Sequence, residues 1–106
     1  MPSVAAGLRH VYHQYTIRVA ENRDAVSAEL AELGVGNAVY YPTPVHRLRP
    51  FLLDGAPDPR WDLPETERAA AEALSLPVHP QLSESDLVRI VDGVTKAVDA
   101  TAGSLR

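Results

Sequence analysis

The sequence predicts a small α/β domain of the α+β kind, a two-layer sandwich in which about three helices cover a sheet of about three strands. Three observations predict this fold class. The chain has 106 residues, which is the size of one domain with one core. Segments in which apolar residues recur with the period of a strand alternate along the chain with segments in which they recur with the period of a helix. Three strand-helix pairs follow one another, an order typical of a two-layer α/β sandwich.

The first strand is expected over residues 11–19, where apolar and polar side chains alternate. Asn22 can cap the segment that follows it, in which apolar residues recur at helical spacing. Gly34 suits the position just past a helix end. We therefore expect the first helix over residues 23–33.

A second, short strand is expected over residues 38–41, which are rich in β-branched and aromatic side chains. Pro42 ends it, because proline has no backbone N–H to donate. Residues 43–63 are rich in proline and contain a turn-like Asp-Gly pair, so we expect one long loop. Loops of this length inside a compact domain are usually functional or mobile.

The second helix is expected over residues 64–74, since Pro64 suits the first helical position. A third strand follows over residues 75–78. Ser83, with Asp86 three residues later, has the spacing of a capping box and predicts the start of the last helix.

The core is expected where the last helix packs on the sheet. Apolar residues of this helix recur on one stripe, and charged residues lie off the stripe. The predicted core residues are Ile17, Val26, Leu30, Leu33, Leu87, Ile90, Val91 and Val94.

The composition excludes several classes of function. Ten Lys and Arg against 14 Asp and Glu give a net charge of -4, the wrong sign for a protein that binds nucleic acid through its phosphates. The chain has no cysteine, which suits a reducing compartment. No apolar run near the start is long enough for a signal peptide or a membrane span. We therefore expect a cytoplasmic protein with no membrane partner, and one domain over residues 1–106.

The four histidines form no closely spaced pair on one helix face, so we expect no metal site. Candidate substrate-binding residues lie around the start of the long loop. Tyr40 or its neighbour Tyr41 can face a ligand while the other packs in the core. His46 lies in the loop, where scaffolds often display functional side chains. Arg47 and Arg49 form a basic cluster suited to phosphate or carboxylate. For each, a purely structural role stays open.

Three segments, in this order and spacing, resemble the C-terminal part of the DegT/DnrJ/StrS family of pyridoxal-phosphate-dependent nucleotide-sugar aminotransferases. They are HVYHQYTIRV (10–19), GVGNAVYYPTPVH (34–46) and LPETERAAAEALSLPVHP (63–80). The resemblance covers residues 10–98, and members of the family are several times longer. It implies the small C-terminal domain of such an enzyme, with the fold of the C-terminal domain of fold-type I enzymes that use this cofactor.

In the family, a lysine of the large N-terminal domain holds the cofactor. The only lysine here is Lys96, expected on the exposed side of the last helix. The resemblance therefore implies that this chain has neither catalytic nor cofactor-binding residues of its own. Pyridoxal phosphate would belong to the full-length enzyme, and the partner would be the N-terminal domain, in the same chain or from a neighbouring gene. A homodimer is also compatible with the family.

On this resemblance Tyr40 and His46 match positions that face the substrate, a nucleotide sugar. After His46 the sequence departs from a shorter His-x-Gln-Pro pattern, which leaves the local path open. The alternative interpretation is a stand-alone α/β interaction or ligand-binding module derived from that domain.

Overall fold

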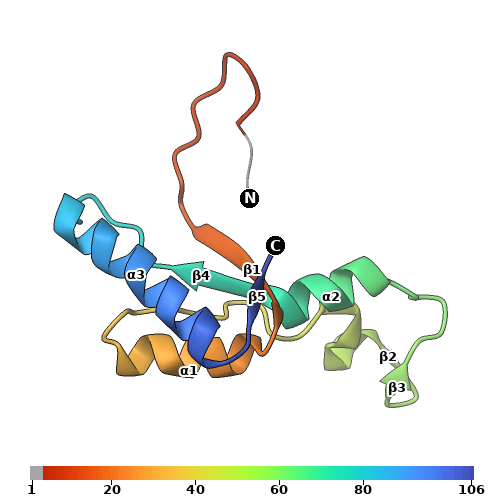
Figure 1. Ribbon diagram of the computed structural model, residues 1–106. Helices are drawn as coiled ribbons and strands as arrows, with labels where there is room; N and C mark the ends of the chain where they lie inside the picture. The colour runs from red at the N-terminus through yellow and green to blue at the C-terminus, as the bar shows by residue number, and fades with distance from the viewer. Residues whose placement is uncertain (1–3) are drawn as a thin grey trace.

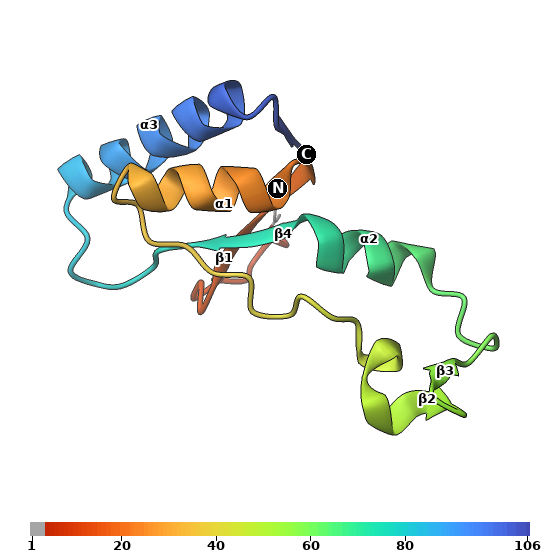
Figure 2. The same cartoon turned by 90° about the horizontal axis from the view of Figure 1, so that it is seen from below.

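The chain folds into two layers in a computed structural model, which describes residues 4–106 (Figure 1). Strands β1 (Tyr15–Glu21), β4 (Ala73–Leu76) and β5 (Ser104–Leu105) form an antiparallel sheet in the order β4-β1-β5. Helices α1 (Arg23–Glu32) and α3 (Glu84–Ala100) lie side by side on one side of this sheet (Figure 2). The predicted α+β fold class is confirmed.

Helix α2 (Pro64–Glu72) projects beyond the end of the sheet and runs directly into β4 (Figure 2). The expected long loop, residues 43–63, contains short elements of its own. Two 3₁₀ turns, η1 (Val45–Arg47) and η2 (Arg49–Phe51), precede a small hairpin. The hairpin strands are β2 (Leu52–Leu53) and β3 (Ala56–Pro57), joined at Asp54 and Gly55, which both have positive φ. The turn at Asp54 and Gly55 was predicted from the sequence, whereas the two strands were not.

The two faces of the sheet differ in chemistry. Ile17 and Val19 of β1 pack with the helices, and Val19 is completely buried. Thr16 lies opposite Ser75 in the antiparallel register, and their hydroxyl oxygens are 2.8 Å apart on the other face. Alternation along the strands therefore gives one apolar face under α1 and α3, and one face of small and polar side chains that no helix covers.

Part of the predicted core is confirmed. Val26, Leu30 and Val94 are buried, and Ile17, Leu33 and Ile90 pack against them. The prediction was wrong for two residues of α3: Leu87 is 50% exposed and Val91 is 63% exposed. The helix turns a different side to the core, formed by Gly93, Val94 and Ala97. The remaining buried apolar residues are Val19, Val35, Leu74 and Ala97.

Close packing between α3 and the end of α1 explains this rotation. A Cβ atom placed on Gly93 would lie 2.8 Å from Val35 Cγ2, so the helix can approach only where it has no side chain. Small residues at a helix contact permit a short distance between backbones. Since the small residues face inward, Leu87 and Val91 face outward.

Three strand predictions need correction. The first strand begins at Tyr15 rather than residue 11, and residues 4–14 extend away from the sheet (Figure 1). The expected strand over residues 38–41 is reduced to a single bridge between Ala38 and Ser75, because the chain then leaves the sheet edge toward α2. The third strand begins at Ala73, directly after the helix, and ends before Pro77, which has no N–H to donate.

The start of α3 confirms the capping box. The Ser83 hydroxyl accepts a hydrogen bond from the Asp86 backbone N–H, and the Asp86 carboxylate accepts one from the Ser83 N–H. The Ser83 hydroxyl also donates to the Asp86 carboxylate, and this bond, followed by the one from the Ser83 N–H, lowers the pKa of Asp86. Within residues 4–106, no helix has both the length and the apolar character that crossing a membrane requires.

Candidate functional site

A cleft of about 350 Å³ opens on the uncovered face of the sheet. Its floor is made of the small side chains of β1, β4 and the Ala38 bridge. One wall is the chain segment that leaves the sheet edge at Ala38, and the other wall is α2. The lining residues are Gln14, Thr16, Ala38, Val39, Tyr40, Tyr41, Thr43, Pro44, Val45, Leu48, Thr66, Ala69, Ala70, Ala73 and Ser75.

The floor of this cleft presents few polar side chains to a ligand. The hydroxyls of Thr16 and Ser75 bond to each other, and the neighbouring floor side chains are alanines. A small, flat and mainly apolar floor suits the face of a ring, and polar groups at the rim would fix its orientation.

The rim carries two exposed tyrosines. Tyr40 is 57% exposed and Tyr41 is 77% exposed, with ring centroids 6.4 Å apart. Neither tyrosine packs in the core. The prediction that one of the two packs there while the other faces a ligand was therefore wrong for the buried one. An exposed tyrosine presents an apolar ring together with a hydroxyl that can donate or accept a hydrogen bond.

His46 and Arg47 lie in η1, behind the wall that carries Tyr40, and neither lines the cleft. His46 is buried at 7% exposure, and its Nε2 lies 2.7 Å from Oε1 of Glu67 on α2. Arg47 Nε donates to the same oxygen at 2.5 Å. The structure therefore brings His46 and Arg47 together on one carboxylate and keeps them apart from Tyr40.

The hydrogen bonds of Glu67 with His46 and Arg47 were not predicted from the sequence. From the sequence, Glu67 suited the positive end of the helix dipole, and its spacing of 21 residues from His46 carried no signal of contact. The hydrogen bond from Arg47 lowers the pKa of Glu67 most, desolvation of the carboxylate opposes this, and the bond from His46 adds a smaller lowering. Glu67 is therefore a carboxylate at neutral pH.

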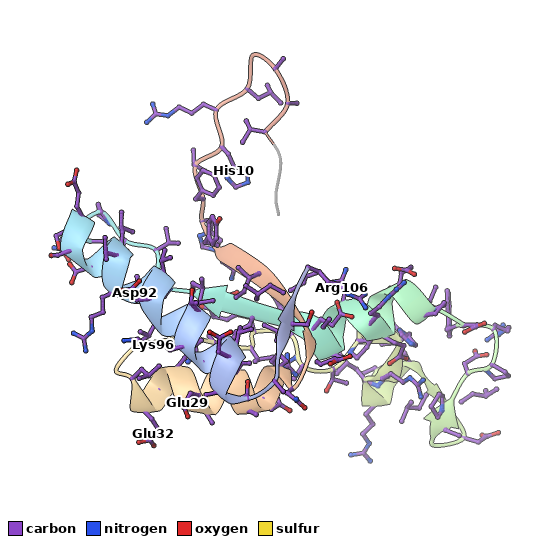
Figure 3. All side chains as sticks on the ribbon, in the orientation of Figure 1. His10, Glu29, Glu32, Asp92, Lys96 and Arg106 are labelled. Carbon is purple, nitrogen blue, oxygen red and sulfur yellow. The ribbon has the colours of Figure 1, made fainter. Side chains whose placement is uncertain are left out.

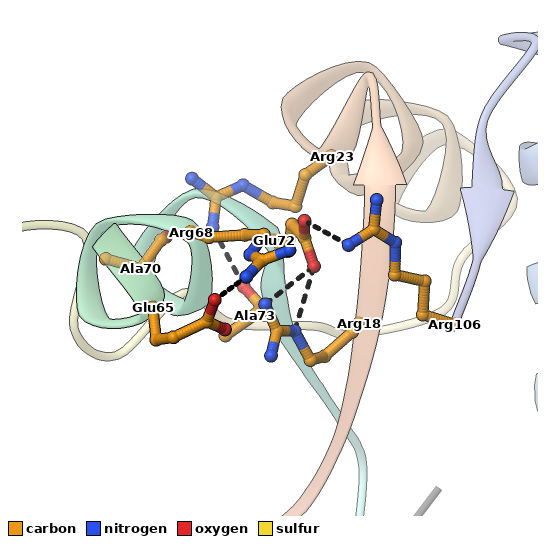
Figure 4. A network of polar contacts seen from close by, with 8 residues as sticks. All are labelled: Arg18, Arg23, Glu65, Arg68, Ala70, Glu72, Ala73 and Arg106. Atoms are coloured by element: carbon orange, nitrogen blue, oxygen red, sulfur yellow. Dashed lines mark hydrogen bonds and ion pairs between the residues drawn. The ribbon is translucent and has the colours of Figure 1, made fainter. Parts of the chain in front are cut away.

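A second hollow adjoins the cleft and shares Thr16, Ala69 and Ala73 with it. Its charged side chains surround Glu72, which is 4% exposed (Figure 4). The Glu72 carboxylate accepts a hydrogen bond from Arg18 Nε at 2.9 Å and lies 3.3 Å from Arg106 Nη1. Arg18 Nη2 lies 2.8 Å from the same carboxylate but at an angle that makes no hydrogen bond, so that contact is an ion pair only.

Arg23 stabilises the junction at which α2 becomes β4. Its Nη1 donates to the backbone oxygen of Ala73 at 2.8 Å and to that of Ala70 at 3.2 Å (Figure 4). These carbonyls belong to the helix end, where no intrahelical donor remains. Arg23 thereby holds α2 in line with the sheet and fixes the helical wall of the cleft.

The other candidate groups lie apart from the cleft. His10 is exposed on the segment before β1 (Figure 3), and His13 is exposed on the same segment. His79 is exposed in the turn before α3. Among residues 4–106, no three His, Cys, Asp or Glu side chains come together in a way that could hold a metal ion.

Lys96 does not fit the role of a cofactor lysine. It is exposed on α3, one turn after Asp92 (Figure 3). It borders a shallow groove formed with the end of α1, and none of the residues that line this groove lines the cleft. A lysine that holds pyridoxal phosphate needs a phosphate site and the substrate within reach. The side chains around Lys96 supply neither.

Comparison with known proteins gives a consistent result. A sequence model described as the DegT/DnrJ/EryC1/StrS aminotransferase family matches residues 1–95. The chain is 43% identical over 95 residues to a "Pleiotropic regulatory protein" of Geobacillus stearothermophilus, covering 90% of this chain and 25% of that protein. It is 36% identical over 98 residues to a "UDP-N-acetyl-3-dehydro-alpha-D-glucosamine 3-aminotransferase" of Acidithiobacillus ferrooxidans, covering 92% and 25%.

The fold also matches that of a solved structure. The crystal structure of DesV of S. venezuelae, in complex with a ketimine intermediate, is similar with a TM-score of 0.75 and 32% identity. The match covers 90% of this chain and 25% of that one. The chain thus spans about a quarter of the length of the proteins that it matches.

Proposed function

Because the chain belongs to the DegT/DnrJ/EryC1/StrS aminotransferase family, we propose that it is the C-terminal domain of an aminotransferase that acts on a nucleotide-linked keto-sugar. In this proposal residues 1–106 form one domain, which lines the substrate cleft and has no activity alone. The observation that carries the proposal is the match of nine-tenths of this chain to a quarter of a UDP-linked 3-oxo-sugar aminotransferase. The shared region is therefore much longer than a single motif.

The uncovered face of the sheet supports this assignment. A sugar ring has an apolar face and a polar edge, and the cleft has an apolar floor with tyrosines at its rim. We assign Tyr40 as a substrate-binding residue that offers its hydroxyl to the sugar. We assign His46 and Arg47 as substrate-binding residues beside the wall, where the imidazole suits a hydroxyl and the guanidinium suits a diphosphate oxygen.

The chemistry of amino transfer belongs to the rest of the enzyme. Pyridoxal phosphate, when bound there, acts as the electron sink for the reaction. The site residues of this domain bind and orient the sugar and exclude water from one side of it. The lysine that holds the cofactor would lie in an N-terminal domain, in the same polypeptide or encoded by a neighbouring reading frame.

A trapping experiment tests this division of labour. The purified chain is mixed with pyridoxal phosphate, reduced with borohydride and analysed by peptide mass spectrometry. We expect no stoichiometric adduct at a single site and no amino transfer to a UDP- or dTDP-linked keto-sugar. Lys96→Arg is the control, since it removes the only side-chain amine that reacts as an ordinary surface lysine. A stoichiometric adduct away from Lys96, or turnover by the chain alone, would contradict the proposal.

A further inference from the structure

The two walls of the cleft are joined by one carboxylate. Val45 and Leu48 on the loop wall flank His46 and Arg47, and Thr66 on the helical wall precedes Glu67. Among the described residues, the contacts of Glu67 with His46 and Arg47 are the side-chain hydrogen bonds that join the 43–63 segment to α2. The distance between the walls therefore depends on Glu67.

We propose that Glu67 is a positioning residue of the cleft, which fixes the loop wall on α2 and fixes the nitrogen of His46 that carries the hydrogen. The importance of the cleft for substrate rests on the proposed function. The arrangement of the three side chains does not, because it is a property of this chain alone.

The protonation pattern follows from the chemistry of the three groups. A carboxylate can only accept hydrogen bonds, and Arg47 can only donate. Glu67 Oε1 accepts from Arg47 Nε, so the same oxygen must also accept from His46. His46 Nε2 therefore carries a hydrogen, and in the neutral ring Nδ1 is left with its lone pair.

Nδ1 of His46 is available to a ligand. It makes no hydrogen bond with the described residues. Among residues 4–106, the only buried side-chain nitrogen or oxygen without a hydrogen bond is Arg18 Nη2. Because Nδ1 of His46 also lacks a hydrogen bond, it is not such a buried atom and is accessible to solvent. Glu67 thereby turns His46 into a directed acceptor, suited to a hydroxyl or amine hydrogen of a ligand that enters beside the loop wall.

The test uses the 106-residue chain without substrate. Nitrogen NMR of the histidine rings at about pH 8 reports the tautomer, and amide hydrogen exchange of Arg47 and Leu48 reports how firmly η1 is held. In the unmodified chain we expect His46 protonated at Nε2. In Glu67→Gln, whose amide can donate as well as accept, we expect mixed tautomers and amide exchange faster by on the order of tenfold.

Glu65→Gln is the matched control. It removes one negative charge from the same first turn of α2, but among the residues that the structure describes Glu65 forms an ion pair only with Arg68 of its own helix. We expect it to leave both the tautomer and the exchange rates unchanged. Protonation of His46 at Nδ1 in the unmodified chain, a measurement that needs no variant, would overturn the proposal. Unchanged tautomer and exchange in a folded Glu67→Gln would overturn it as well.

Discussion

Tyr40 and His46 stand in different physical situations although both are candidates for the same site. The Tyr40 side chain is largely exposed at the rim of the cleft, whereas His46 is buried and bonded to Glu67. In the proposed site, a substitution at Tyr40 therefore removes a group expected to contact the ligand. A substitution at His46 removes such a group and also one attachment of the loop wall.

In a complete enzyme that carries this domain, Tyr40→Phe is expected to lower kcat/KM by about 2-fold to 10-fold. It deletes one hydroxyl, and a neutral hydrogen bond contributes about 0.5 to 1.5 kcal/mol. His46→Ala should lower kcat/KM more, up to about 150-fold if its bond to the ligand is charge-assisted. Both variants should load the cofactor normally. Steady-state kinetics and the cofactor's absorbance provide the two measurements. Full efficiency with lowered stability in both would mean that the two residues are structural.

Acid should weaken the attachment of the loop wall. The pKa of Glu67 in the folded chain is held below its ordinary value of 4.5 by Arg47 and then by His46. A carboxyl with a depressed folded-state pKa stabilises the fold above its unfolded-state pKa, and this contribution is lost as the pH falls through the folded-state value. The difference in unfolding midpoint between the unmodified chain and Glu67→Gln should therefore be largest near neutral pH and shrink below about pH 4.5. A difference that stays constant from pH 7 to pH 3 would argue against the ion pair.

Among the helices and strands, the sequence correctly predicted features that depend on neighbouring residues, such as where a helix starts. The capping box at Ser83 fixes the start of α3, and Pro64 fixes the start of α2, as expected. The alternation in β1 correctly placed Ile17 toward the helices. Each of these features depends on neighbours within a few residues along the chain.

What the sequence could not predict depends on tertiary contacts. The apolar stripe of α3 is wider than the surface that α3 buries, and only the contact of Gly93 with Val35 decides which part of it turns inward. The strand expected at residues 38–41 has suitable residues but a partner for Ala38 alone. The sequence singled out Tyr40, which lies at the rim of the cleft, but it contained no signal of the carboxylate of Glu67 that His46 and Arg47 share.

The substitution Gly93→Ala tests the packing of α3, because the sign of the change in unfolding free energy depends on that packing. In an exposed helix, Gly→Ala stabilises by about 1 kcal/mol. Here the new methyl group would meet the branched Cγ2 of Val35 at 2.8 Å, so we expect Gly93→Ala to destabilise by about 1 to 3 kcal/mol. Chemical denaturation measures this change, and Gly55→Ala is unsuitable as a control because Gly55 has positive φ. Val35→Ala combined with Gly93→Ala should recover part of the loss. A more stable Gly93→Ala would mean that α3 packs elsewhere.

As a whole molecule, the chain exposes many large apolar side chains for its size. They occur on the segment before β1, around the cleft and at the start of α3. The exposed members include Leu8, Val11, Tyr41, Phe51 and Val91. Exposed apolar side chains that gather in one contiguous patch are typical of a surface that a partner covers. Such exposure fits a domain whose relatives are about four times as long.

The activity of a chimera tests most directly whether this chain is the C-terminal domain of a nucleotide-sugar aminotransferase. The corresponding last quarter of the Acidithiobacillus ferrooxidans relative is replaced by this chain, and amino transfer to its UDP-linked 3-oxo sugar is measured. We expect the chimera to turn over substrate, while the truncated relative and the 106-residue chain are each inactive. A folded chimera that loads the cofactor but shows no turnover, or a 106-residue chain that is active alone, would contradict the account.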